Sequence, residues 1–213
     1  MNWEFDDETH RFTIDGQPTP SVTHVLQALG CTPWTDGLRG RGPSPHLERG
    51  KDVHASIKLY ELGKLRREDL SGYEHVGYLD SWIEFRSRVE WKTHQIEKPM
   101  VCETSRYGGI PDITGTWHLG RRLVLADVKT GRDLPHYELQ VSAYNDLLDE
   151  PHLRVLIFLR ADGGLAQHKI IQSHDSTNAW RSAITLYHWR LRNGYLPIEE
   201  DQYRLRPLKG QLP

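Results

Sequence analysis

The chain has 213 residues, of which 37 % are hydrophobic and 26 % are charged, a balance that predicts a globular chain with a sizeable core. Its 27 basic and 29 acidic residues nearly cancel, so the net charge gives no sign of a nucleic-acid-binding protein. Only Cys31 and Cys102 are available, which excludes a cluster with four cysteine ligands from one chain and makes a disulfide framework unexpected.

The chain carries no signal for a membrane or for export. No run approaches the roughly 18–20 apolar residues that a membrane helix needs. Residues 1–7 contain neither a basic region nor an apolar region of the kind that begins a signal peptide. We therefore expect a cytoplasmic protein with no signal peptide, no transmembrane segment and no membrane partner.

The first half of the chain is predicted to be mainly helical. Residues 3–14 form a small hairpin, and a helix follows that Ser21 caps and Gly30 ends. Residues 32–45 are rich in proline and glycine and predict a basic loop. Apolar spacing then predicts helices over 47–62 and 78–89, before an extended stretch over 95–104.

Strand signals dominate the second half. Short β-rich runs cover 109–118, 122–130, 153–161 and 165–172, with one helix over 136–148 between the second and third runs. A last helix covers 177–192. The order predicts an α+β (mixed α/β) fold without Rossmann-type alternation. We expect a single domain, with a hairpin and helices over 1–94, a core over 95–194 and a basic tail over 195–213.

Three charged residues on two neighbouring strands suggest a metal site. Asp127 and Lys129 are two apart on a predicted strand, so their side chains project from the same face. An antiparallel pairing would bring Asp112 alongside Asp127. Two carboxylates supply the oxygen ligands that Mg²⁺ or Mn²⁺ prefers, and a nearby ammonium suits a phosphate or an attacking water. Taken singly, each residue would be an ordinary strand or surface charge.

The order of these motifs resembles a known superfamily. Asp112, then Asp127 to Gly131, then Gln140 and Tyr144 are similar to the motifs of PD-(D/E)XK nucleases, in their RecB-like, phage-type exonuclease branch. Arg49 to His54 and Pro20 to Thr23 resemble segments before the core in that branch. The resemblance implies a restriction-endonuclease-like αβββαβ core, with a central mixed sheet flanked by helices.

The same resemblance implies the catalytic and metal-binding residues. Asp112 and Asp127 would be catalytic metal ligands, and Lys129 the catalytic lysine. The backbone carbonyl of Val128 and the side chain of His54 would be further metal ligands. Glu103 matches a carboxylate near the metals in relatives. One or two Mg²⁺ or Mn²⁺ ions are implied, and the two cysteines rule out the iron–sulfur members.

A second group of residues is expected to bind nucleic acid or to support the site. The resemblance implies that Gln140 and Tyr144 lie on the helix behind the active strand, where they would orient the site or touch DNA. Their spacing of one helical turn by itself predicts only a shared, half-buried helix face. The remaining members are basic, aromatic or hydroxyl-bearing side chains near the site: Thr130, Arg49, Arg132, Trp34, Arg39 and Arg41.

The implied function is a metal-dependent deoxyribonuclease that hydrolyses phosphodiester bonds. We expect an exonuclease acting on DNA ends in recombination or repair, in a bacterial or phage-infected cell. DNA is the expected substrate, and a recombination or single-strand-binding protein is a further expected partner. The alternatives are a structure-specific or nicking endonuclease and a non-catalytic nucleic-acid-binding module with the same fold. Strand preference, polarity and oligomeric state stay open.

Overall fold

The computed structural model describes residues 2–32, 45–118 and 121–196. Its N-terminal part is a three-stranded antiparallel sheet, where the sequence predicted a two-stranded hairpin. After β1 (Trp3–Asp6) and β2 (Arg11–Ile14), the chain turns again into β3 (Gln17–Thr19). Asp15 and Gly16 both have positive φ, which suits a tight turn between antiparallel strands. This turn adds the third strand.

Helices follow the predicted order with small differences in their bounds. Ser21 caps α1 (Val22–Ala28), since its hydroxyl accepts a hydrogen bond from the His24 N–H. Next come α2 (Pro45–Glu61), the short 3₁₀ helix η2 (Arg67–Leu70) and α3 (Val76–Arg88). Proline suits the first turn of a helix, which explains the early start of α2. The predicted loop over 32–45 falls almost entirely outside the described residues.

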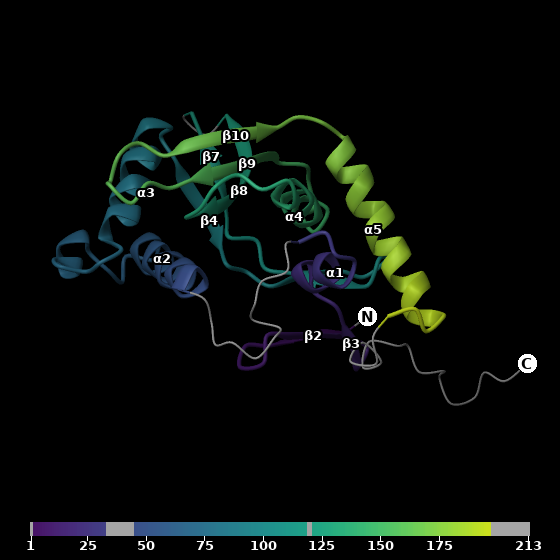
Figure 1. Cartoon of the computed structure of the whole chain (residues 1–213). Coiled ribbons are helices and arrows are strands. Elements are labelled where there is room, and N and C mark those ends of the chain that lie inside the picture. Colours follow the sequence, from purple (N-terminus) through teal and green to yellow (C-terminus); the bar gives the residue numbers. More distant parts are fainter. Residues whose placement is uncertain (1, 33–44, 119–120, 197–213) are drawn as a thin grey trace, which may run out of the picture.

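The central sheet has five strands in the order β10-β9-β8-β7-β4 (Figure 1). They are β4 (Lys92–Ile96), β7 (Ile113–Trp117), β8 (Arg122–Lys129), β9 (Leu153–Phe158) and β10 (Gln167–Ile171). Only β8 and β9 are parallel, and α4 (His136–Asn145) forms the crossover between them. The succession α3-β4-β7-β8-α4-β9 gives an αβββαβ core. The predicted fold class is confirmed.

One predicted strand is divided in two. The run over 109–118 contains the end of β6 (Tyr107–Gly109), which pairs with β5 (Met100–Cys102), and then the separate strand β7. Pro111 lies between them and has no N–H to donate to a ladder. The break places Asp112 at the entrance to β7.

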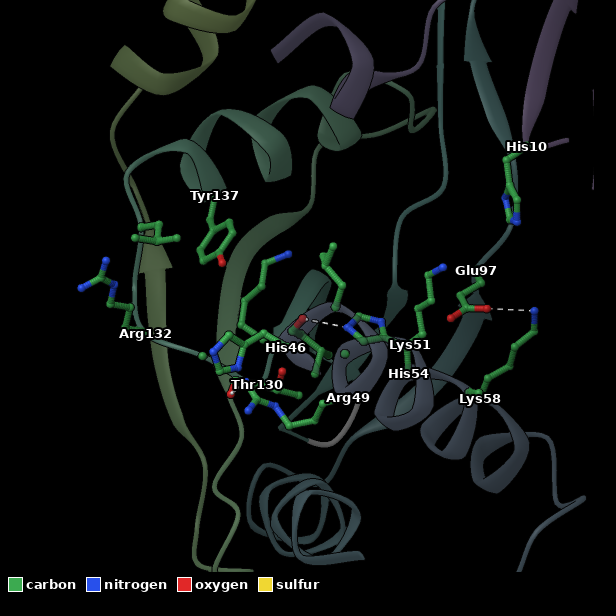
Figure 2. A pocket seen from close by; sticks show the side chains of 17 residues that line it. His10, His46, Arg49, Lys51, His54, Lys58, Glu97, Thr130, Arg132 and Tyr137 are labelled. Atoms are coloured by element: carbon green, nitrogen blue, oxygen red, sulfur yellow. Dashed lines mark hydrogen bonds and ion pairs between the residues drawn. The ribbon is translucent and has the colours of Figure 1, made fainter. Parts of the chain in front are cut away.

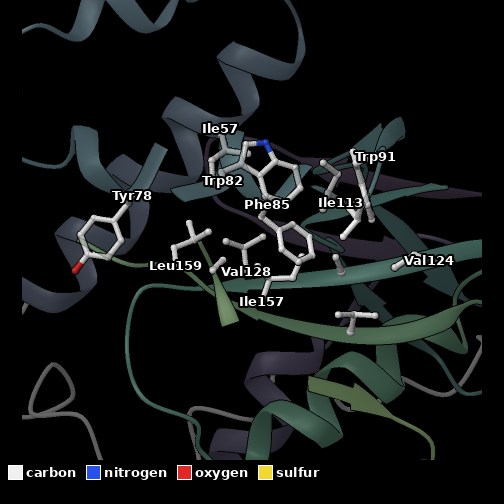
Figure 3. Packing of buried hydrophobic residues seen from close by; sticks show 14 of the residues in the cluster. Ile57, Tyr78, Trp82, Phe85, Trp91, Ile113, Val124, Val128, Ile157 and Leu159 are labelled. Atoms are coloured by element: carbon white, nitrogen blue, oxygen red, sulfur yellow. The ribbon is translucent and has the colours of Figure 1, made fainter. Parts of the chain in front are cut away.

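Helices cover both faces of the central sheet, and β8 alternates between the two cores. Val124, Ala126 and Val128 face the cluster beneath α2 and α3, where Trp82 and Phe85 pack over the sheet (Figure 3). Leu125 belongs to the cluster beneath α1, α4 and α5 (Asp175–Arg192). Successive side chains of a strand point to opposite faces. Asp127 and Lys129 therefore point toward α4, and Val128 points toward α2.

No helix in the described part of the chain combines the length and apolarity that crossing a membrane requires. The last helix, α5, begins two residues before the predicted helix and ends where expected. Of the predicted basic tail, all but residues 195 and 196 lie outside the described residues.

Candidate active site

Asp112 and Asp127 lie on neighbouring strands in the expected register. Ile113 pairs with Ala126 in the antiparallel ladder of β7 and β8, so the next pair outward is Asp112 and Asp127. Asp112 is fixed by the backbone of β8, because the Val128 N–H donates to its Oδ2 at 2.7 Å. The break before β7 thus brings one carboxylate to the end of the strand that carries the other.

Asp127 is fully buried beside the ammonium of Lys129. Its Oδ2 lies 2.6 Å from Lys129 Nζ, yet neither Asp127 oxygen accepts a hydrogen bond of normal geometry. Burial raises the pKa of Asp127 to about 6, against the opposing effect of Lys129. Burial alone would lower the pKa of Lys129, but Asp127 and Asp112 outweigh it, so the net shift is upward and Lys129 remains an ammonium.

Gln140 and Tyr144 support Lys129 from α4. Lys129 Nζ donates to Gln140 Oε1 at 3.1 Å, and Gln140 Nε2 donates to the Tyr144 hydroxyl at 3.1 Å. Their spacing of four residues stacks them on one helix face, as expected. Tyr144 is buried, and burial raises its pKa. Both residues therefore orient Lys129 from behind the active strand.

His54 reaches the site from α2, on the other face of the sheet. Its Nε2 donates to the Val128 carbonyl oxygen at 3.1 Å, and its Nδ1 lies 3.6 Å from Asp112 Oδ1. The His54 imidazole and the Val128 carbonyl, two groups expected to bind metal, are thus hydrogen-bonded to each other. The His54 side chain thus lies close to Asp112, and its role as a metal ligand stays a prediction.

The donor atoms suit a hard divalent ion, although they are not grouped as a finished metal site. In the part of the chain that the structure describes, no three His, Cys, Asp or Glu side chains are grouped to hold a metal ion. Asp127 Oδ1 is buried and has no hydrogen-bond donor among the described residues, and the Asp112 carboxylate and the Val128 carbonyl offer further oxygen atoms. A divalent ion would satisfy such oxygens. The Val128 carbonyl oxygen has two lone pairs, so it could bind an ion while it accepts the hydrogen bond from His54.

The structure places Glu97, rather than Glu103, beside the site. Glu103 is exposed in the turn between β5 and β6 and does not line the cleft. Glu97 follows β4, donates its N–H to the Asp112 carbonyl oxygen at 2.9 Å and pairs with Lys58 at 2.9 Å. A register shift in β4 and a φ of 43° at Glu97 redirect the chain here. Only the pairing of β4 with β7 reveals this proximity.

A cavity of about 1200 Å³ opens beside these residues, between α2 and the segment that leads from β8 into α4 (Figure 2). Among the described residues, its lining contains one acidic side chain, Glu97. The other ionisable side chains in it are basic or aromatic: His10, His46, Arg49, Lys51, His54, Lys58, Lys129, Arg132 and Tyr137. The cavity therefore suits a polyanion. We call it the basic cleft.

The remaining predicted site residues divide between the cleft and the part of the chain not described. The residues that line the basic cleft are Arg49, Thr130 and Arg132. Arg49, in α2, donates to the carbonyl oxygen of Thr130, the residue after β8, at 3.3 Å. Trp34, Arg39 and Arg41 lie outside the described residues. His10 was missed by sequence analysis, since only the fold brings the turn between β1 and β2 to the cleft mouth (Figure 2).

No protein-family model and no curated protein matches this sequence. Among the solved structures that are similar to this chain, two share 11 % of its sequence. The structure of LHK-Exo in complex with dAMP gives a TM-score of 0.48 over 83 % of this chain and 89 % of that one. The structure of SSO0001 gives a TM-score of 0.32 over 80 % and 88 %. At these scores neither likeness assigns a function to this chain.

Proposed function

We propose that this chain is a metal-dependent nuclease of the PD-(D/E)XK superfamily, in its RecB-like branch, and that it hydrolyses phosphodiester bonds of DNA. The observation that carries the proposal is the setting of Lys129. Its ammonium is held between Asp127 and Gln140 and lines a cleft in which all the charged side chains of described residues except Glu97 are cationic. A preorganised cation beside two carboxylates suits the transfer of a phosphoryl group.

The charge of the basic cleft supports a nucleic-acid substrate. The chain as a whole is nearly neutral, so the gathering of Arg49, Lys51, Lys58, Lys129 and Arg132 is local. Cationic side chains around a concave site attract phosphates and raise their local concentration. A neutral total charge is therefore compatible with binding DNA.

Each group at the site has a definable task. Lys129 would donate to the scissile phosphate or orient the attacking water, and Gln140 with Tyr144 would keep its ammonium in place. Asp112 and Asp127 would hold one or two Mg²⁺ or Mn²⁺ ions. Such an ion, when bound, lowers the pKa of a bound water and neutralises negative charge on the phosphate.

A substitution at Lys129 tests the proposal. Purified Lys129→Ala should lose cleavage of a labelled DNA fragment in Mg²⁺ by at least about a hundredfold, as expected for loss of a charged group that acts on the transition state. Lys92→Ala is the matched control, because Lys92 is an exposed lysine at the far end of β4. Equal cleavage by both variants would contradict the assignment.

The preference for DNA ends needs a separate measurement. The resemblance favours an exonuclease in recombination or repair, so linear DNA should be degraded and a covalently closed circle should persist. Both substrates are incubated in Mg²⁺, with EDTA as the blank. Degradation of the circle would instead support the structure-specific or nicking endonuclease.

A non-catalytic nucleic-acid-binding module is the second candidate, and one contact favours it. His54 Nε2 donates to the Val128 carbonyl oxygen, so this ring nitrogen carries a proton and is not free to bind a metal ion. Calorimetric titration with Mn²⁺ distinguishes the two functions. Heat of binding that disappears in Asp127→Asn supports the nuclease, whereas DNA binding without Mn²⁺ uptake supports the module.

A further inference from the structure

The ring of Tyr137 is a further contact of the Lys129 ammonium. Tyr137 lies in the first turn of α4, and Lys129 Nζ stands 4.5 Å from the centre of its ring. Asp127 and Gln140 contact the same ammonium. The Lys129 side chain is 15 % exposed, so little water is left to hold it. The ring face is therefore a substantial part of its surroundings.

The contact matters because a lysine side chain is long and has several rotatable bonds. An ammonium that leaves water is attracted by the negative face of an aromatic ring. Asp127 holds Lys129 by charge, but its Oδ2 accepts no hydrogen bond of normal geometry. A second constraint from a flat ring would limit the directions in which the ammonium can move.

The Tyr137 hydroxyl has a different setting from its ring. Tyr137 lines the basic cleft, and Figure 2 shows its side chain pointing into the cavity. Within residues 2–32, 45–118 and 121–196, no hydrogen-bond partner of this hydroxyl is found. A phenol at neutral pH can donate to an anion.

We propose that Tyr137 is a positioning residue whose ring holds the Lys129 ammonium toward the cleft, and whose hydroxyl donates to a phosphate of the bound nucleic acid. The second part rests on the proposed nuclease function. The first part does not, since it concerns the protein alone.

The positioning of Lys129 can be measured without catalysis. An amine-acylating reagent is applied to the native protein, and the acylated fraction of Lys129 is read by mass spectrometry. Removal of the ring in Tyr137→Leu should speed acylation of Lys129 roughly three- to tenfold, whereas Tyr137→Phe, which keeps the ring, should match the parent. Tyr60→Leu is the matched control, because Tyr60 packs against Arg86 in a similar contact at 5.5 Å.

Kinetic constants test the two roles separately. Tyr137→Leu should lower kcat, because Lys129 loses its orientation, and Tyr137→Phe should restore kcat. Tyr137→Phe should raise KM for a labelled oligonucleotide roughly fivefold, because one hydrogen bond to phosphate is lost. Tyr137→Met replaces Tyr137→Leu if the latter does not fold, as judged by thermal unfolding.

The outcomes separate this proposal from the proposed function. If Lys129 in Tyr137→Leu is acylated at the parental rate, the ring does not position it, whatever the activity. If Tyr137→Phe has the parental KM, the hydroxyl does not contact phosphate. A parent protein that cleaves no nucleic acid would overturn the proposed function and the role of the hydroxyl, while the acylation measurement would still decide the role of the ring.

Discussion

The Asp112 carboxylate accepts a hydrogen bond from the Val128 N–H at 2.7 Å. This bond connects the residue that directly precedes β7 with the second-last residue of β8. The carbonyl oxygen of Val128, which belongs to the next peptide unit, accepts a hydrogen bond from His54. The backbone of one residue, Val128, therefore connects the two strands of the site with helix α2. Asp112 has both a structural and a chemical task, and the two can be separated.

Asp112→Ala and Asp112→Asn should differ in stability and agree in activity. Alanine leaves the Val128 N–H without its acceptor, which should cost about 1–3 kcal/mol of unfolding free energy. Asparagine keeps a carbonyl oxygen for that N–H, so its stability should stay closer to the parent. Both lose the carboxylate and should lose cleavage. Chemical denaturation and a cleavage assay measure the two effects, and full activity in Asp112→Asn would contradict the role.

Mn²⁺ should stabilise the folded protein through Asp127. A ligand that binds only the folded state at 100 times its Kd adds about 2.7 kcal/mol. The Tm of the parent should therefore rise with Mn²⁺ concentration, while that of Asp127→Asn should not. Glu103→Gln serves as the control, because Glu103 is exposed in a turn away from the cleft. A parental Mn²⁺ response in Asp127→Asn would argue against this ligand.

Glu97→Gln should impair cleavage more than Glu103→Gln. The Glu97 N–H donates a hydrogen bond to the Asp112 carbonyl oxygen. Among the described residues, Glu97 is the one acidic residue that lines the basic cleft. Changes to groups that support metal ligands commonly cost 10–100-fold, so a loss of about tenfold is expected. Glu103→Gln should keep parental activity. The reverse order would restore the assignment made from sequence.

Gln140→Leu should reduce cleavage while leaving the fold intact. It removes the side-chain oxygen that accepts from Lys129, so the ammonium loses an anchor worth about 1 kcal/mol or more. Tyr144→Phe acts one step further away, on the Gln140 amide, and should have a smaller effect. Initial rates with saturating DNA compare the variants. A larger loss in Tyr144→Phe would contradict this order.

His188 should make stability depend on pH on the acid side. Burial lowers its pKa, and Arg192 and Arg106 act in the same direction, while hydrogen bonds to the Ser105 and Arg106 backbone oppose them. A lowered histidine pKa means that its stabilisation is present above the unfolded value of 6.5 and is lost as pH falls through the folded value.

The test compares denaturation midpoints at pH 7.5 and pH 5. The parent should lose more stability between the two values than His188→Gln, which cannot gain a proton and still offers a donor to the Ser105 carbonyl. Identical losses in the two proteins would show that His188 does not titrate in this range.

The sequence by itself predicted the fold class. It also predicted that one candidate site on two neighbouring strands and the following helix contains Asp112, Asp127, Lys129, Gln140 and Tyr144. The reason is that these features are local or periodic. Alternation along a strand places Asp127 and Lys129 on one face, and helical spacing stacks Gln140 on Tyr144. An unbroken apolar run before Asp127 marks a strand buried on both faces.

Only the tertiary structure decided which distant residues meet. Glu97 replaces Glu103 beside the site because β4, with its register shift, pairs with β7, and no spacing along the chain reveals that pairing. His10 reaches the cleft through the N-terminal sheet, and Tyr137 meets Lys129 where α4 crosses the sheet. Burial of Asp127 likewise depends on packing from several elements, which is why its raised pKa could not be predicted from sequence.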